Sequence, residues 1–345
     1  MKKGSKYGIH RVIEPKGGLP QSATKISNDM EIFDNEILID VNYLNIDSAS
    51  FSQLKDEAGG NVEKIKKKIL KIVNDKGKMQ NPITGSGGML IGRVEGIGDS
   101  LRDKIDLKVG DKIATLVSLT LTPLRIDKIL NIKPDIDRVD INGKAILFES
   151  GIYAKLPEDI EDTLALAALD VAGAPAQTEK LVKQGDCVLI LGATGKSGLM
   201  CSYIAKKKVG PQGKVIGQAR NEKRAKFLIS TEFCHEVIIA DVLKPIEVLN
   251  ETLKVNNGKE VDISINCLSI PNTEMSSILP VKENGVVYFF SMATSFTKAA
   301  LGAEGVGKDV VMIIGNGYTK GHSQIALDEL RESDKLRKIF EEKYV

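Results

Sequence analysis

The sequence has no tryptophan, and aromatic residues make up only 5% of its 345 positions. A protein that stacks nucleic-acid bases on aromatic side chains is therefore not expected. The charges also nearly cancel, at 48 basic against 46 acidic residues, so no strong field attracts nucleic acid. No apolar run approaches the ~20 residues that cross a membrane, and no apolar stretch of signal-peptide length follows the basic segment Met1–Gly8. We expect a cytoplasmic protein without a nucleic-acid or membrane partner.

Cysteine is also scarce. The four cysteines, Cys187, Cys201, Cys234 and Cys267, all lie in the second half of the chain, and none belongs to a C-x-x-C pair. This spacing fits neither a zinc ribbon nor a disulfide framework. We interpret them as buried free thiols in a reducing compartment.

The first half of the chain is typical of a β-rich domain, and the length predicts two domains at roughly 100–200 residues each. Segments 36–44, 88–98 and 109–114 have the polar–apolar mixture or the glycine punctuation of strands. Between them, segment 61–73 has apolar residues at helical spacing and lysines on the opposite side. This predicts an amphipathic helix inserted into the β domain. We interpret its lysines as a solvated face, with anion steering as the alternative.

From about Pro157 the pattern changes to alternating helices and strands. A helix at 161–171 is followed by strands at 187–191, 214–218, 237–240, 263–267, 286–290 and 310–314, with helices at 198–208, 222–229 and 245–255. This order predicts an α/β fold, with a doubly wound parallel sheet and helices on both of its faces. The tail, 323–344, is predicted to be helical.

A glycine-rich segment between the first strand of this half and the next helix is the strongest functional signal. It reads Gly192-Ala193-Thr194-Gly195-Lys196-Ser197-Gly198. A nucleotidase phosphate loop would need a glycine five residues before Gly195, where Ile190 stands. The G-x-x-G-x-x-G spacing fits a dinucleotide loop whose helix N-terminus binds a pyrophosphate. A purely structural turn is the alternative. The predicted cofactor-binding residues here are Gly192, Thr194, Gly195, Lys196, Ser197 and Gly198.

The second strand of such a fold ends with the group that recognises the ribose. An acid there favours NAD, whereas a nearby arginine accommodates the 2′-phosphate of NADP. The sequence after this strand has Arg220 and Asn221 and no acid at the strand end. We therefore expect NADP or NAD as the cofactor, with Arg220 and Asn221 as binding residues. A surface arginine without this role is the alternative.

The β-rich half followed by the dinucleotide half resembles the medium-chain dehydrogenase/reductase superfamily, and the glycine loop resembles that of its quinone-oxidoreductase branch. The resemblance implies a GroES-like catalytic domain at 1–156, a Rossmann domain at 157–322 and a C-terminal helix at 323–345 that returns to the first domain. It also places five further residues beside the cofactor. They are Cys267, Ser291, Met292, Gly315 and Asn316.

Long segments elsewhere resemble a more specific dehydrogenase family, which acts on L-erythro-3,5-diaminohexanoate. These segments are 78–92, 164–177, 289–309 and 313–322. The resemblance implies NAD(P)-dependent oxidative deamination of that diamino acid to 5-amino-3-oxohexanoate and ammonia, in lysine fermentation. It also implies a small-molecule substrate and a homodimer.

The zinc-dependent relatives in this superfamily hold a catalytic metal with Cys, His and Cys. Here the matching segments have Asp47 and Ser48, then Ser86, then Asp170, so thiolate and imidazole ligands are missing. We expect no catalytic metal. The predicted catalytic residues are Asp47, Ser48, Ser86, Glu149 and Asp170, with the three acids as ammonium ligands or proton acceptors. Alternatively, Asp47 forms a turn, Glu149 is a rim charge and Asp170 ends a helix.

Two other functions remain open from the sequence. One is an NADPH-dependent quinone or enone reductase, which the glycine loop alone does not distinguish from an amine dehydrogenase. The other is a non-catalytic NADPH-binding protein. Carboxylates in the pocket favour the amine substrate, whereas an apolar pocket favours the quinone.

Overall fold

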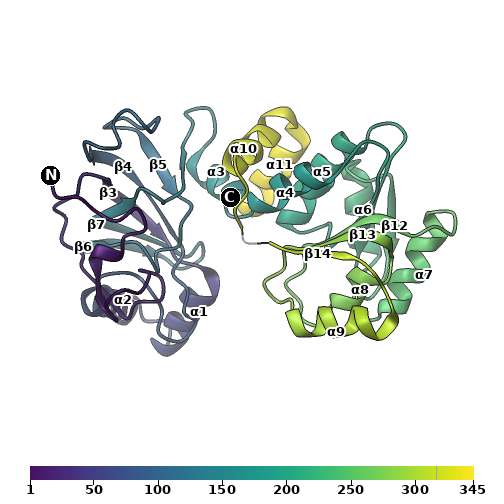
Figure 1. Ribbon diagram of the computed structural model, residues 1–345, viewed down its shortest axis with the longest axis horizontal. Helices are drawn as coiled ribbons and strands as arrows, with labels where there is room; N and C mark the ends of the chain where they lie inside the picture. Colours follow the sequence, from purple (N-terminus) through teal and green to yellow (C-terminus); the bar gives the residue numbers. More distant parts are fainter. Residues whose placement is uncertain (316) are drawn as a thin grey trace. The chain divides into compact units, whose positions relative to one another are not determined.

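The computed structural model describes residues 1–315 and 317–345, without the side chains of residues 48 and 49. The described residues cluster into two compact units, Met1–Asp159 and Ile160–Val345 (Figure 1). Within this described part of the chain, every helix is too short or too polar to traverse a lipid bilayer.

The first unit is built on an antiparallel sheet. Among the described residues its strand order is β6-β7-β3-β4-β5-β8, and a short β1–β2 pair lies apart from it. The strands are β1 (Val12–Glu14), β2 (Lys25–Ile26), β3 (Glu36–Asn45), β4 (Met89–Ile97), β5 (Lys112–Thr115), β6 (Leu124–Lys133), β7 (Arg138–Phe148) and β8 (Tyr153–Lys155). The β6–β7 hairpin was not predicted. A strand is recognised in a sequence by alternating polar and apolar residues, and two register shifts in this pairing interrupt that alternation.

Two helices cover the apolar face of this sheet. They are α1 (Ser48–Glu57) and α2 (Val62–Lys76). The second confirms the predicted amphipathic helix, because Ile65, Ile69 and Val73 are buried in the core beside the strands. Its first turn is capped by Asn61, whose Oδ1 accepts from Lys64 N at 3.0 Å. It ends at Gly77, where φ is +73° and a side chain would be strained.

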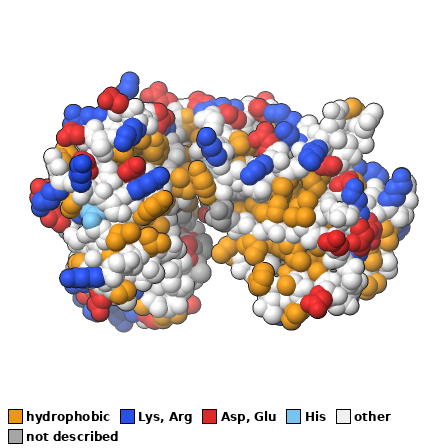
Figure 2. Space-filling view, in the orientation of Figure 1, with side chains coloured by type: hydrophobic (Ala, Val, Ile, Leu, Met, Phe, Trp, Pro, Cys, Tyr) orange, Lys and Arg blue, Asp and Glu red, His pale blue; other side chains and the backbone are white. Residues whose placement is uncertain are grey.

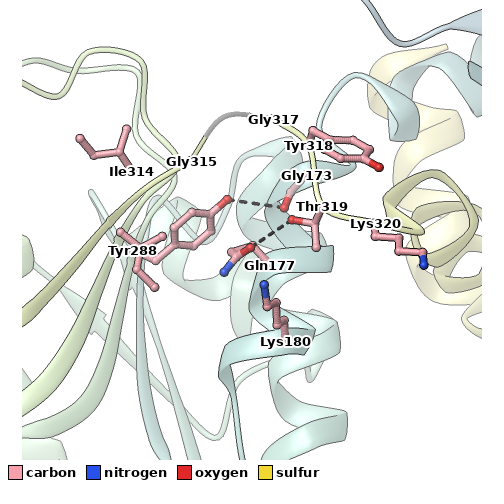
Figure 3. Close-up of a pocket in the computed structure, with 11 residues that line it drawn as sticks. Gly173, Gln177, Lys180, Tyr288, Ile314, Gly315, Gly317, Tyr318, Thr319 and Lys320 are labelled. Atoms are coloured by element: carbon pink, nitrogen blue, oxygen red, sulfur yellow. Dashed lines mark hydrogen bonds between the residues drawn. The ribbon is translucent and has the colours of Figure 1, made fainter. Parts of the chain in front are cut away.

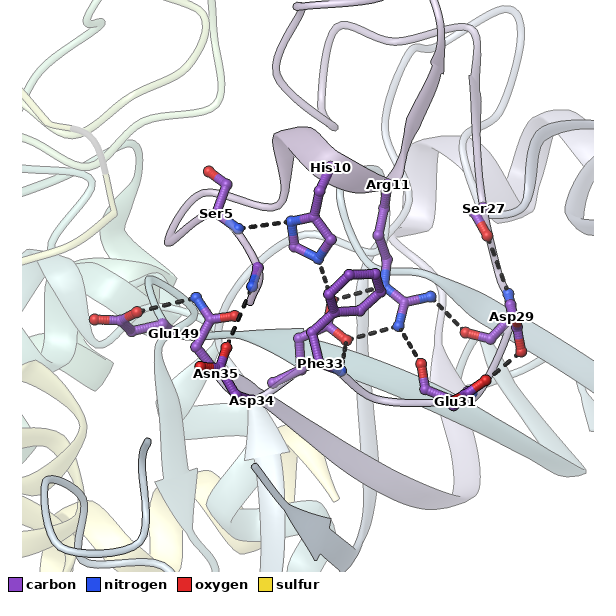
Figure 4. A network of polar contacts seen from close by, with 12 residues as sticks. Ser5, His10, Arg11, Ser27, Asp29, Glu31, Phe33, Asp34, Asn35 and Glu149 are labelled. Carbon is purple, nitrogen blue, oxygen red and sulfur yellow. Dashed lines mark hydrogen bonds and ion pairs between the residues drawn. The ribbon is translucent and has the colours of Figure 1, made fainter. Parts of the chain in front are cut away.

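A buried ion network joins the N-terminal segment to the start of β3 (Figure 4). The Glu36 carboxylate is fully buried, and the Arg11 guanidinium donates to both of its oxygens at 2.6 Å. His10 Nε2 lies 2.9 Å from Glu36 Oε1, and Phe33 N donates to Oε2. Two charges removed from water are tolerable only when they are paired in this way. His10 is thus part of the framework of this unit.

The second unit confirms the predicted doubly wound sheet. Its described strands are all parallel, in the order β11-β10-β9-β12-β13-β14. The strands are β9 (Cys187–Leu191), β10 (Lys214–Ala219), β11 (Glu236–Ile239), β12 (Val261–Asn266), β13 (Val281–Phe289) and β14 (Val311–Ile314). The helices are α3 (Asp162–Leu169), α4 (Gly173–Leu181), α5 (Lys196–Val209), α6 (Glu222–Thr231), α7 (Pro245–Val255), α8 (Glu274–Ile278), α9 (Phe296–Val306), α10 (His322–Glu332) and α11 (Asp334–Tyr344). The order of strands reverses between β9 and β12, which is where ligands bind in folds of this class.

The C-terminal tail is helical, as predicted, and its expected return to the first domain stays a prediction. It forms two helices, α10 and α11, and belongs to the second unit, where it contacts α3, α4 and α5 (Figure 1). The apolar faces of the tail explain this, because Ala326, Leu330, Leu336 and Phe340 are buried there. The two helices are separate because Ser333 caps the second one, with its Oγ accepting from Leu336 N at 3.1 Å.

Candidate functional site

The glycine loop joins the end of β9 to the start of α5, as the sequence predicts. Gly192 has a φ of +76°, which favours glycine. A Cβ on Gly198 would lie 2.2 Å from the Gly192 carbonyl oxygen, so only glycine allows the helix to approach the strand this closely. These two glycines therefore shape the loop, and their predicted contact with the cofactor stays a prediction.

Gly195, unlike Gly198, has open space where a side chain would stand. It stands at the N-cap of α5 with an extended backbone, and a Cβ there would meet only the Gly192 oxygen, at 3.4 Å. The first backbone N–H groups of a helix have no partner inside the helix, and the helix dipole makes this end positive. Open space therefore lies in front of a helix end that suits an anion.

A cavity of about 780 Å³ opens at this helix end. Its lining is Asp170, Val171, Gly195, Lys196, Ser197, Cys267, Leu268, Ser269, Phe290, Ser291, Met292, Ala293, Gly315 and Gly317. Many of the residues predicted to bind the cofactor are among them, although they come from four separate stretches of the chain. The roles of these residues stay predictions. Asn316 lies outside the described residues.

An ion pair at the edge of this cavity joins a predicted catalytic residue to a predicted cofactor residue. Lys196 Nζ donates to Asp170 Oδ2 at 2.8 Å, and both side chains are partly exposed. Asp170 also ends α3, so its interpretation as a helix-end group fits as well. The pair places one carboxylate and one ammonium within reach of a ligand in the cavity.

Gln218 holds the strand ends around the loop and was missed by the sequence analysis. It is buried in β10, where its Oε1 accepts from Gly192 N at 3.1 Å and its Nε2 donates to Ala240 O at 2.8 Å. One amide thus connects the segments that follow β9 and β11. A buried glutamine inside an apolar strand was the available signal, since such a group needs partners.

Arg220 and Asn221 follow β10, as predicted, and are exposed. Asn221 caps α6, with its Oδ1 accepting from Arg224 N at 3.0 Å. The Arg220 guanidinium makes no hydrogen bond or ion pair with another described residue. It is therefore a cation that remains able to pair with a ligand.

A second cavity, of about 510 Å³, is lined by residues of α4 and by residues 313–315 and 317–320 (Figure 3). Thr319 Oγ1 donates to Gln177 Oε1 at 3.0 Å, and Tyr288 Oη donates to Gly173 O at 3.5 Å. Burial raises the pKa of Tyr288 well above its usual value, so the phenol keeps its proton. The first contact joins the segment after β14 to α4, and the second joins β13 to α4. Gly315 borders both cavities.

In the first unit, Asp47 and Ser86 come together through Ser50. Asp47 caps α1, with its Oδ1 accepting from Ser50 N at 3.0 Å. Its buried Oδ2 has no hydrogen-bond partner among the described residues. Ser50 Oγ lies 2.8 Å from Ser86 Oγ and 2.5 Å from Thr84 Oγ1. The turn role of Asp47 is thus present, but it leaves one carboxylate oxygen unused.

The loop that carries Ser86 is fixed by Asn81, which the sequence analysis did not single out. Asn81 is buried, and its Nδ2 donates to Ser50 O and to Gln53 Oε1 at 3.2 and 2.8 Å. Its Oδ1 accepts from Ile83 N at 2.8 Å. Ser48, the other residue predicted here, has its side chain outside the described part.

Glu149 belongs to a different cluster of the same unit. It is exposed, and its Oε2 accepts from Asn35 Nδ2 at 3.1 Å beside the buried ion network (Figure 4). Among the described residues, its hydrogen bond goes to Asn35 and not to Ser50 or Ser86. Its catalytic role stays a prediction, and its rim position fits the alternative interpretation.

The described residues contain no cluster of side chains that could bind a metal ion. No group of three or more His, Cys, Asp and Glu side chains there could hold an ion. The expected independence from zinc continues to rest on the residue types at positions 47, 86 and 170.

Comparisons with known proteins give two full-length relatives. The chain is 70% identical to L-erythro-3,5-diaminohexanoate dehydrogenase of Acetoanaerobium sticklandii over 99% of this chain and 100% of the relative. It is 68% identical to the enzyme of that name from Fusobacterium nucleatum, over 100% of each chain. Residues 10–157 match a family model described as the L-erythro-3,5-diaminohexanoate dehydrogenase N-terminal domain.

Solved structures share the fold at low identity. The CurK enoyl reductase has a TM-score of 0.54 at 16% identity, covering 96% of this chain and 86% of that one. The Escherichia coli quinone oxidoreductase complexed with NADPH has a TM-score of 0.52 at 17% identity, covering 91% and 84%. These likenesses confirm the predicted fold class of a β-rich unit with a Rossmann unit.

Proposed function

The chain belongs to the L-erythro-3,5-diaminohexanoate dehydrogenase family, and we propose that it catalyses the reaction for which that family is named. It oxidatively deaminates L-erythro-3,5-diaminohexanoate to 5-amino-3-oxohexanoate and ammonia, with NADP or NAD as the hydride acceptor. The full-length similarity to both relatives carries this proposal. A role in lysine fermentation is part of it.

The described residues fit the cofactor. The open space at Gly195, the free end of α5 and the cavity beside them suit a pyrophosphate and the groups that follow it. Backbone N–H groups at Lys196 and Ser197 would hold the phosphates, and Arg220 would hold a 2′-phosphate. When bound, NADP or NAD supplies the electron acceptor for the hydride.

The residues of this chain must also remove a proton. The reacting amine is an ammonium ion near neutral pH, and it has no lone pair to stabilise the carbon that gives up the hydride. A base must therefore deprotonate it first. We propose Asp170, because its carboxylate lines the cavity next to Lys196. Water then adds to the substrate iminium carbon, and ammonia leaves.

Asp47 and the hydroxyl groups around Ser50 are proposed as a polar group of the first unit that can hold an ammonium. The support is the buried Asp47 Oδ2, which has no partner among the described residues and can accept from an ammonium. Ser86 and Thr84 would extend this site with hydroxyl groups that both donate and accept. Glu149 remains the other carboxylate candidate.

Steady-state kinetics with L-erythro-3,5-diaminohexanoate and each cofactor test the proposal. We expect cofactor reduction that depends on the diamino acid and survives exhaustive treatment with EDTA, because no thiolate or imidazole stands at the zinc positions. Reduction of a quinone by NADPH without activity on the diamino acid would instead support a quinone reductase. Cofactor binding without turnover would support a non-catalytic role. Loss of activity with EDTA that zinc restores would overturn the proposed zinc independence.

Arg220→Ala should weaken NADP binding roughly 10- to 100-fold and leave NAD binding nearly unchanged. The reason is that a hydrogen bond to a charged phosphate contributes about 1.5–3 kcal/mol, and NAD lacks this phosphate. Because Arg220 is exposed, added salt should reduce the difference. The measurement is Kd for both cofactors at fixed ionic strength. Arg102→Ala, in the other unit, serves as the control, and equal losses for NADP and NAD would contradict the assignment.

A homodimer is also proposed. The edge strand β14 leaves Val311 and Ile314 54% and 62% exposed, and α9 leaves Phe296 and Leu301 71% and 62% exposed. Figure 2 shows hydrophobic side chains over this part of the second unit. An apolar sheet edge of this kind is a surface that pairs with another chain.

A cytoplasmic location is proposed as well, supported by the four free thiols.

A further inference from the structure

We propose that Cys201 and Cys267 form a redox-modifiable pair, which a hydroperoxide converts into a disulfide that weakens ligand binding in the adjacent cavity. Their Sγ atoms lie 3.8 Å apart, although the residues are 66 positions apart in the sequence. The sulfur atoms are thus in contact without being bonded. The proposal rests on the proposed function only in taking the cavity ligand to be NADP or NAD.

The two thiols differ in their access to solvent. Cys267 follows β12 and lines the cavity together with Lys196 and Ser197. Cys201 lies in α5 and is completely buried. A small oxidant can therefore reach Cys267 through the cavity, while Cys201 is placed to react only with its neighbour.

The other two cysteines serve as internal references. Burial raises the pKa of Cys187 and of Cys234 to about 11, and it raises the pKa of Cys201 well above its usual value. The contact between two sulfur atoms, and not the pKa, therefore distinguishes Cys201 and Cys267 from these references. Neither has another cysteine in contact within the described residues. Oxidation should therefore involve one specific pair among the four cysteines.

The chemistry balances with one hydroperoxide. The Cys267 sulfur attacks the peroxide oxygen, which gives a sulfenic acid and releases an alcohol, or water from hydrogen peroxide. The Cys201 sulfur then attacks the Cys267 sulfur, its proton leaves with the hydroxyl as water, and the S–S bond forms. The two thiols are oxidised by two electrons in total, and the peroxide is reduced. A dithiol reductant reverses the bond by thiol–disulfide exchange.

The new bond would act on the glycine loop. Bonded sulfur atoms are about 2.05 Å apart, so they must close from the present 3.8 Å. Cys267 cannot move alone, because its N–H donates to Leu191 O at 3.0 Å and its carbonyl carbon lies against Gly192. Pulling Cys267 toward α5 therefore displaces the start of the loop whose other end meets the cofactor.

The experiment treats the reduced protein with hydrogen peroxide, then maps its peptides by mass spectrometry without reduction. We expect a linked Cys201–Cys267 peptide that dithiothreitol releases, and slower formation when NADPH occupies the cavity. Cys201→Ser and Cys267→Ser should each abolish the link, while Cys187→Ser, the matched control, should retain it. The Kd for NADPH should be severalfold higher in the oxidised wild type than in the reduced protein, and it should return to the lower value on reduction.

Each contrary outcome is distinguishable. No disulfide, or a different pairing, overturns the pair itself. A Cys201–Cys267 disulfide that leaves the Kd for NADPH unchanged overturns its effect on the cavity. If the reduced protein binds neither NADPH nor NADH, the proposed cofactor fails, and the mass measurement still decides whether the pair forms.

Discussion

Replacing Gly195 with valine should weaken binding of both NADP and NAD roughly 10- to 100-fold or more while leaving the fold intact. The backbone there is extended, and a Cβ would meet only one atom, at 3.4 Å, so the chain itself accommodates a side chain. The added methyl groups would fill the space in front of α5 where the pyrophosphate is placed. Losing one charge-assisted hydrogen bond costs about 1.5–3 kcal/mol. Calorimetric Kd values for both cofactors measure the effect.

Gly305→Val is the matched control for this variant. Gly305 lies in α9, and a Cβ on it would meet no atom within 4 Å, so it too has room for a side chain, but it is not part of the cavity lining. Its cofactor affinities should equal those of the wild type. A folded Gly195→Val protein with unchanged affinities would show that the pyrophosphate does not bind at this helix end.

Glu36→Ala should destabilise the first unit by about 3–5 kcal/mol, the usual cost of leaving one member of a buried ion pair without its partner. Arg11 is 2% exposed, and its guanidinium relies on Glu36 for two hydrogen bonds. The variant also removes an acceptor from Phe33 N and from the neighbouring His10. Native-state hydrogen exchange of backbone amides within residues 1–159 would measure the free energy of unfolding of this unit.

Two comparisons test whether burial is the cause. Asp127→Ala breaks the exposed Arg125–Asp127 pair, whose side chains are 44% and 54% exposed, and should cost at most about 1 kcal/mol. The double variant Arg11→Met with Glu36→Leu removes both charges together and should recover most of the lost stability. If Glu36→Ala costs no more than Asp127→Ala, the network does not stabilise the unit as described.

The functional loop and the elements around it could be predicted from local sequence patterns. The structure has β9 at the predicted bounds, Cys187–Leu191, because a short apolar run bounded by glycine is a sufficient signal. The helix after the loop and the helix Pro245–Val255 were likewise predicted from their periodicity and their end residues. The alternation of strand and helix then determined the fold class, since parallel strands require such crossovers.

Only the tertiary structure decided which side chains meet. Lys196 and Asp170 are 26 residues apart, and Ser50 and Ser86 are 36 apart, and no local pattern pairs them. The strand order places Cys267 beside α5, and the buried face of α10 and α11 keeps the tail in the second unit. Local periodicity depends on neighbours three or four positions away, whereas these contacts depend on how strands are ordered and which apolar faces bury one another. The sequence by itself therefore determined the strands of the second unit, the glycine loop and the family, while the assembled groups around the cavity came from packing at long range.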